Sequence, residues 1–152
     1  MLKPSEVLQN ILKNPKDLAH VQSLVADDVT YVSLNYQDAD LHKIMPWCGT
    51  SRGAEAIVKT FIDVGRFWEI VSFDPEAIFG DDEHAAMFGR FTYRSTRLSK
   101  LVTSPFAVYA KVKNGRCTYL QFMEDTFATA GSFRSGGTWT FESDPNGQVV
   151  AI

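Results

Sequence analysis

The second half of the chain is a succession of strand-like segments separated by short turn signals, and this pattern restricts the fold more than any other feature. The segments are rich in the β-branched and aromatic side chains that favour extended backbone. They cover residues 67–72, 77–79, 85–95, 102–112 and 116–124. Gly80-Asp81-Asp82 and Lys113-Asn114-Gly115 lie between successive segments, and Asn-Gly is a strong signal for a tight hairpin. The pattern therefore predicts a meander of long antiparallel strands.

The first half contains three short amphipathic helices, whose apolar residues recur at helical spacing. The stripes are Val7, Leu8, Ile11 and Leu12 in the first helix, Leu18, Val21 and Leu24 in the second, and Ile57, Phe61 and Val64 in the third. Asn14-Pro15 separates the first two helices, and Gly65 marks the predicted end of the third. A further strand is expected at residues 29–34 and a last short helix at 126–133.

Helices and strands that occupy separate parts of the chain indicate one α+β domain rather than a parallel doubly wound sheet. The 152 residues, of which 45% are hydrophobic and 22% charged, are enough to build a core without metals or disulfides. We expect the domain to occupy residues 1–135 and residues 136–152 to form a C-terminal extension of it.

The predicted strand at residues 85–95 carries large side chains on both faces. Alternation places Met87, Gly89, Phe91 and Tyr93 on one face and Phe88, Arg90, Thr92 and Arg94 on the other. Such a sheet needs a cover on each side. The helices suffice for one side, so we expect a homodimer packed through the other. Gly89 in mid-strand favours a bend, and a bent sheet closed by helices encloses a pocket.

The predicted pocket is mainly apolar and aromatic, so a small apolar or aromatic molecule is the expected partner. On the last strand, the two-residue period places Tyr119, Gln121, Met123 and Asp125 on one face, which we expect to point into the pocket. The candidates for ligand contact are Trp47, Phe61, Met87, Phe91, Tyr119, Gln121 and Met123.

Three segments resemble motifs of SnoaL-like members of the NTF2-like superfamily. They are Pro46-Trp47-Cys48-Gly49-Thr50-Ser51-Arg52-Gly53, the strand Gly89-Arg90-Phe91-Thr92-Tyr93-Arg94, and the hairpin and strand from Lys113 to Thr126. The resemblance implies a cone-shaped α+β barrel with a deep pocket, usually dimeric. Its members include polyketide cyclases, ketosteroid isomerases, epoxide hydrolases, dehydratases and non-catalytic binding modules, so the fold alone does not define the function.

In cyclase-like members of this superfamily, an aspartate at the end of the last strand often faces the cavity, and Asp125 matches that position. The aromatic residue common two positions earlier is Met123 here. A carboxyl group at the edge of an apolar cavity is desolvated, which raises its pKa and suits it to acid–base catalysis near neutral pH. Asp125 is equally well placed to cap the helix that begins at Thr126.

Two functions therefore follow from the sequence. The first is a cofactor-free enzyme of the isomerase, cyclase or dehydratase type, in which Asp125 moves a proton while Tyr31 or Tyr93 polarises a carbonyl oxygen. The second is a non-catalytic binding or accessory module with the same pocket. An epoxide hydrolase ranks last, because it would need a second carboxylate in the pocket.

Other classes of function find little support. The net charge of −3 without a long basic run argues against nucleic acid as a partner. The histidines, His20, His42 and His84, lack metal-ligand spacing, so no metal or other cofactor is expected.

The location of the protein is predicted from three features. The apolar run at residues 101–110 is too short to cross a membrane as a helix. The N-terminal residues lack the apolar core of a secretory signal. The distant Cys48 and Cys117 allow one disulfide but fit a reduced pair more simply, so a cytoplasmic location is expected.

Overall fold

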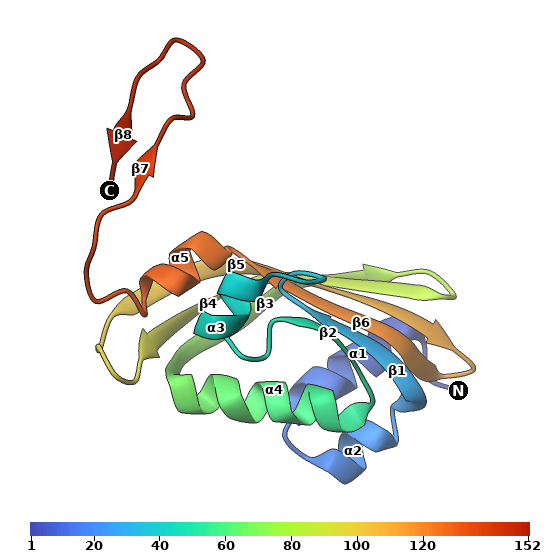
Figure 1. Ribbon diagram of the computed structural model, residues 1–152. Helices are drawn as coiled ribbons and strands as arrows, with labels where there is room; N and C mark the ends of the chain where they lie inside the picture. The colour runs from blue at the N-terminus through green and yellow to red at the C-terminus, as the bar shows by residue number, and fades with distance from the viewer.

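The computed structural model describes residues 1–152, and its core is one bent six-stranded sheet with helices packed on it (Figure 1). The strand order is β2-β1-β6-β5-β4-β3. The helices are α1 (Pro4–Lys13), α2 (Leu18–Gln22), α3 (Ala39–Ile44), α4 (Ala54–Phe67) and α5 (Thr126–Gly131). The strands are β1 (Val25–Ser33), β2 (Gly49–Arg52), β3 (Trp68–Gly80), β4 (His84–Ser95), β5 (Leu101–Lys113), β6 (Arg116–Glu124), β7 (Thr140–Phe141) and β8 (Val150–Ala151). The α+β class predicted from the sequence is confirmed.

The antiparallel meander is formed by β3, β4, β5 and β6, as predicted. The hairpin between β5 and β6 turns at Asn114 and Gly115, both with positive φ (52° and 75°). Two successive positive φ values define the turn type that Asn-Gly favours, because its twist matches that of the flanking strands. One pairing is parallel, since β1 lies beside β6 in the same direction.

Two strands differ in length from the prediction. Asp74-Pro75 does not interrupt β3; the pairing with β4 instead shifts register on either side of it, between Ile70 and Ser72 and between Pro75 and Ala77. Proline is tolerated there because β3 is an edge strand, whose outward amide needs no partner. β1 begins four residues early, at Val25, because pairing with Cys117 extends it.

Helix α4 is longer than the sequence predicts, and the segment between β1 and α4 contains a short helix and a short strand. Helix α4 continues past Gly65 to Phe67, and Trp68 ends it in an extended conformation. The segment after Ser33 contains the short helix α3, which Asp38 caps by accepting a hydrogen bond from the Leu41 amide. Residues 49–52 form the edge strand β2 against β1.

The helices α1, α2 and α4 cover one face of the sheet (Figure 1). Their apolar stripes pack against the core as predicted, except for Leu18 of α2, which is 38% exposed. On β4, Met87, Phe91 and Tyr93 point into this core. The opposite face of β4 is bare in the single chain: Phe88 is 49% exposed, and Arg90 pairs there with Glu76 at 2.9 Å. The division of β4 into two faces therefore follows the predicted alternation.

At Gly89 in the middle of β4, the backbone of β3 and a side chain of β5 approach closely. A Cβ atom at this position would collide with the backbone oxygen of Asp74 and lie 2.7 Å from the ring of Phe106. The register shift in β3 after Pro75, the partner of Gly89, bends the sheet at the same level. Glycine is therefore needed here for space, as expected for a bend in mid-strand.

The C-terminal extension, residues 136–152, forms a small hairpin of β7 and β8 that projects away from the sheet (Figure 1). Arg134 holds the base of this hairpin, since its guanidinium donates to the backbone oxygens of Gly136, Gly137 and Ile152. None of the helices in the chain has the length and apolarity required to cross a membrane.

We predict that Gly89→Ala lowers the free energy of unfolding by about 1–3 kcal/mol, the usual cost of overpacking a core. Urea denaturation followed by circular dichroism measures the change. Gly136→Ala is the matched control, because a Cβ atom there would meet no neighbour within 4 Å. Equal stability of the two variants would contradict the steric role of Gly89.

Candidate functional site

A small cavity lies between the inner face of the sheet and α4, at the end of β6. Its volume is about 20 Å³, which is room for roughly one water molecule. The lining residues come from β1, the segment after it, α4, β4 and β6. They are Tyr31, Ser33, Leu34, Trp47, Thr60, Phe61, Val64, Tyr93, Phe122 and Glu124.

Glu124, the last residue of β6, is the one carboxylic acid in this lining. Its Oε2 atom is shielded from solvent and has no hydrogen-bond partner. Burial raises the pKa of Glu124 to about 7; a hydrogen bond with the Thr129 side chain opposes this shift, and the charge of Asp125 adds to it. A desolvated carboxylate with one oxygen unpaired is costly, so the protein stabilises the protonated form. Glu124 is therefore able to hold or release a proton near neutral pH.

Two tyrosines share the cavity with Glu124. Burial raises the pKa of Tyr31 to about 12, although hydrogen bonds with Ser33 and Thr60 oppose the shift. Burial raises the pKa of Tyr93 as well, and the charge of Glu124 contributes to both shifts. Both phenols are thus protonated at neutral pH and available as hydrogen-bond donors.

Together these groups form a set suited to acid–base chemistry. A carboxyl group poised near neutrality lies among apolar walls with two phenols in the same lining. Such an arrangement moves a proton at a carbon atom while a phenol stabilises the oxygen that becomes negative. No three His, Cys, Asp or Glu side chains lie close enough together to hold a metal ion.

Asp125 occupies a different position from the one predicted. Its side chain is exposed and caps α5, with Oδ1 accepting a hydrogen bond of 3.1 Å from the Ala128 amide. The prediction that Asp125 points into the cavity is therefore wrong, and the alternative prediction of a helix cap is confirmed. The residue that sequence reasoning missed is its neighbour, Glu124.

The error lies in the choice of the inward face of β6. Leu120 and Phe122 are buried, and Glu124 follows them on the same face. The signal was present in the sequence, because two large aliphatic or aromatic residues two apart mark the core side of a strand, and the next residue in that series is Glu124.

The polar face of β6 is correspondingly on the outside of the sheet. The Tyr119 hydroxyl donates to Gln121 at 2.9 Å, the Gln121 amide lies 3.3 Å from the sulfur of Met123, and Met123 is 46% exposed. The expectation that these three residues point into the pocket is wrong for the same reason as for Asp125.

The remaining candidates separate into two groups. Trp47 and Phe61 line the cavity together with Tyr31 and Tyr93, as expected from the sequence. Met87 and Phe91 are buried in the core but do not line the cavity. Contact with a ligand stays a prediction for all of these residues.

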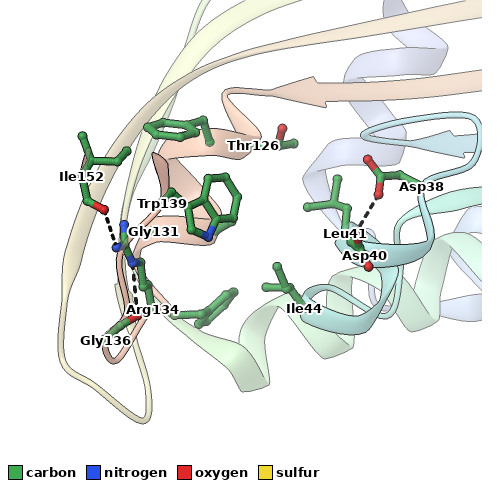
Figure 2. A pocket seen from close by; sticks show the side chains of 13 residues that line it. Asp38, Asp40, Leu41, Ile44, Thr126, Gly131, Arg134, Gly136, Trp139 and Ile152 are labelled. Carbon is green, nitrogen blue, oxygen red and sulfur yellow. Dashed lines mark hydrogen bonds between the residues drawn. The ribbon is translucent and has the colours of Figure 1, made fainter. Parts of the chain in front are cut away.

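A second and much larger hollow, of about 710 Å³, lies between α3 on one side and α5 with the base of the C-terminal hairpin on the other. We call it the α3–α5 groove. Figure 2 shows Leu41 and Ile44 on one wall and Trp139 opposite them, with the side chains facing across the space. Its lining consists of Asp38, Asp40, Leu41, Ile44, Thr126, Phe127, Ala130, Gly131, Phe133, Arg134, Gly136, Trp139 and Ile152.

An aromatic partition separates this groove from the cavity. Trp68 contacts Tyr93 of the cavity on one side, with ring centroids 5.4 Å apart, and Phe133 of the groove on the other, at 4.5 Å. Trp47, in the cavity lining, packs against Trp68 at 5.5 Å. The Trp68 indole also donates to Ser132 at 2.9 Å, which ties the partition to the end of α5.

Solved structures share this fold. An NTF2-like protein from Burkholderia thailandensis superposes with a TM-score of 0.74 at 20% identity, covering 88% of this chain and 99% of that chain. TerC, crystallised with polyporic acid, gives a TM-score of 0.68 at 17% identity, covering 88% of this chain and all (100%) of that chain. The arrangement of sheet and helices is therefore that of NTF2-like proteins.

Sequence comparison gives the family. Residues 12–120 match the model of the SnoaL-like domain. Patulin synthesis protein F of Aspergillus clavatus is 42% identical over 135 residues, which are 86% of this chain and 68% of that protein. Patulin biosynthesis cluster protein F of Penicillium expansum is 39% identical over 150 residues, or 95% and 75% of the two chains. The chain belongs to the SnoaL-like domain family, as its motifs imply.

The raised pKa of Glu124 predicts how stability changes with pH. Native Glu124 keeps its proton up to a pH of about 7, whereas the ordinary value is 4.5. Between these values the native state binds more protons than the unfolded state, so ionisation of Glu124 lowers the free energy of unfolding as the pH rises.

We compare the free energy of unfolding of the unmutated protein with that of Glu124→Gln. The difference should change in favour of the variant as the pH rises from 4.5 to about 7, and should be constant below and above this range. Urea unfolding of both proteins at closely spaced pH values measures the difference. Parallel stability curves over this window would contradict the desolvated carboxyl group.

Proposed function

We propose that this protein is a cofactor-free enzyme that moves a proton on a small apolar molecule containing a carbonyl group, as an isomerase or a cyclase does. The observation that carries the proposal is the Oε2 atom of Glu124, which is buried in the cavity lining without a hydrogen-bond partner. Glu124 takes the role that the sequence suggested for Asp125. A bound ligand with an acidic C–H or a carbonyl oxygen would satisfy this unpaired atom.

The proposed chemistry divides the work between the carboxyl group and the phenols. Ionised Glu124 removes a proton from the carbon next to the ligand carbonyl, and the carbonyl oxygen gains negative charge. Tyr31 or Tyr93 stabilises that oxygen by donating a hydrogen bond. Glu124 then returns the proton to another carbon atom, which completes an isomerisation. In a cyclisation the enolate carbon instead attacks a second carbonyl carbon of the ligand, and Glu124 gives the proton to the alkoxide oxygen that forms.

The relatives support small-molecule chemistry. The two fungal proteins are named for the synthesis of patulin, and the TerC structure contains polyporic acid. The family match carries this support to the present chain, and the similarity to TerC supports the fold.

A non-catalytic binding or accessory module is the second candidate, and the size of the α3–α5 groove favours it, because a hollow of about 710 Å³ holds a small molecule without using Glu124. The cavity at Glu124 has room for roughly one water molecule and does not hold an organic ligand, so a ligand has to displace side chains before it reaches Glu124. Trp47 is the lining residue best placed to move, because it is only half-buried and follows the exposed helix α3.

Activity separates the two candidates. We expect the protein to accelerate conversion of 3-cyclohexen-1-one to its conjugated isomer, followed by the absorbance of the enone. Loss of the acid–base group in Glu124→Gln should lower the rate by about 10²–10⁴-fold. In the native protein the rate should rise with pH and level off above about 7, where Glu124 is ionised.

The matched control is Asp125→Asn, the same change at the neighbouring carboxylate on the outside of the strand. It should leave the rate near the native value. A native protein no faster than buffer would support the binding module, and a Glu124→Gln variant as fast as the native protein would overturn the role of Glu124.

We further propose that two copies of the chain pack through the outer face of the sheet. This face presents exposed apolar side chains, among them Phe79 and Phe88, whose rings stack at 6.0 Å. Ion pairs between Arg90 and Glu76 and between Arg94 and Glu69 lie on the same strands. An apolar centre with charged groups around it is the usual makeup of a protein interface.

The free, buried cysteines suit a reducing compartment, so a cytoplasmic location remains part of the proposal.

We expect Phe88→Asp to convert the dimer to a monomer, because it introduces a desolvated charge into the interface. Sedimentation velocity measures the molecular mass. Ile62→Asp is the control, since Ile62 is exposed to a similar degree (43%) on α4, away from the sheet face. A native protein that is monomeric at micromolar concentration would contradict the proposal.

A further inference from the structure

The α3–α5 groove has the size and the walls of a ligand site, and the proposed chemistry does not use it. Its volume, about 710 Å³, lies within the range of small-molecule sites, whereas the cavity at Glu124 is far below that range. The indole of Trp139 is 57% exposed and is held from behind by the edge of Phe127, with ring centroids 6.4 Å apart. Across the groove, Ile44 is 39% exposed. Two apolar walls thus face each other without a filling group (Figure 2).

The charged groups at the rim of the groove all have partners within the chain. The Asp38 carboxylate caps α3, and Asp40 lies 3.7 Å from Lys43. Arg134 donates to the backbone oxygens of Gly136 and Ile152 (Figure 2). It also donates to that of Gly137. Each charged group at the rim is thus engaged within the chain, and none is left to pair with a charged ligand. The groove therefore favours a neutral, flat and apolar group that stacks on the Trp139 ring.

The groove and the cavity lie on opposite sides of one wall. Helix α5 contributes Thr126, Phe127 and Ala130 to the groove, and its Thr129 contacts Glu124 on the other side. The aromatic partition of Trp47, Trp68 and Phe133 fills the remaining distance. Displacing part of this partition would join the two spaces into one site.

We propose that the α3–α5 groove is the outer subsite of the ligand, and that it binds a neutral aromatic ring system whose carbonyl end reaches Glu124. The inference rests on the proposed function and specifies its substrate class: a ketone attached to an aromatic ring system, of which 3-cyclohexen-1-one represents only the reacting end. The α5 and hairpin wall of the groove lies beyond residues 12–120, the part that matches the family model. The opposite wall, formed by α3, lies within that part, so only the α5 and hairpin side of the subsite is outside the matched domain.

The test uses prodan, a neutral naphthalene that carries a ketone and whose emission shifts to the blue in apolar surroundings. We expect the native protein to bind it with a blue shift. Trp139→Ala and Ile44→Asp should each weaken binding by about tenfold, through loss of the aromatic contact and of one apolar wall. The matched control for Ile44→Asp is Ile62→Asp, equally exposed on α4 and outside the groove, which should bind as the native protein does.

The outcomes separate this subsite from the proposed chemistry. Weaker binding in both groove variants, with Glu124→Gln inactive toward 3-cyclohexen-1-one, supports both. Weaker binding in the groove variants with an active Glu124→Gln supports the subsite and overturns the catalytic role. Absence of prodan binding to the native protein, or native affinity in Trp139→Ala and Ile44→Asp, overturns the subsite whatever the activity. Thermal unfolding of each variant verifies that it is folded.

Discussion

The central constraint in this molecule is the removal of the Glu124 carboxyl group from water. Its Oε2 atom is buried without a partner, and burial raises its pKa to about 7. In a stable protein an unpaired buried acceptor is uncommon, because its lost hydration is not compensated. The surrounding structure has to supply that stability, which it does through the core of α1 and α4 against β4, β5 and β6. A carboxyl group maintained at this cost is a strong indication of function.

The position of Glu124 depends on which face of β6 points inward. A shift of one residue along the strand exchanges all inward and outward side chains. Here Leu120 and Phe122 occupy the inside, so Glu124 lies in the cavity lining and Asp125 turns outward to cap α5. The hydroxyl oxygen of Ser104 reinforces this placement by accepting a hydrogen bond of 3.0 Å from the backbone amide of Asp125.

Local features of the fold could be predicted from the sequence, and non-local ones could not. The apolar stripe of α1 and the turn at Asn114-Gly115 depend on residues close together in the chain, and both were predicted correctly. The parallel pairing of β1 with β6 joins segments about ninety residues apart, and no local pattern near Val25 reports it. The inward face of β6 is a different case: the local pattern of Leu120 and Phe122 marks it, yet the acid was assigned to the opposite face.

The α3–α5 groove extends the account beyond the cavity. The cavity of about 20 Å³ contains the acid but is too small for an organic ligand. The groove of about 710 Å³ is large enough but does not contain Glu124. In the proposed site, displacement of the partition of Trp47, Trp68 and Phe133 joins the cavity, as the reactive end, to the groove, as the binding end. Loop and side-chain movements of this kind, in which binding completes the catalytic arrangement, are common in enzymes that exclude water from the reaction.

The ionisation of Glu124 in the folded protein tests the account most directly. Carbon-13 NMR of protein labelled at the glutamate side-chain carboxyl carbon reports it, and the signal absent from Glu124→Gln identifies the residue. The account predicts a midpoint of about 7 for this signal. A midpoint near the ordinary value of 4.5 would show that the carboxyl group is solvated, and would contradict both its burial and its proposed role.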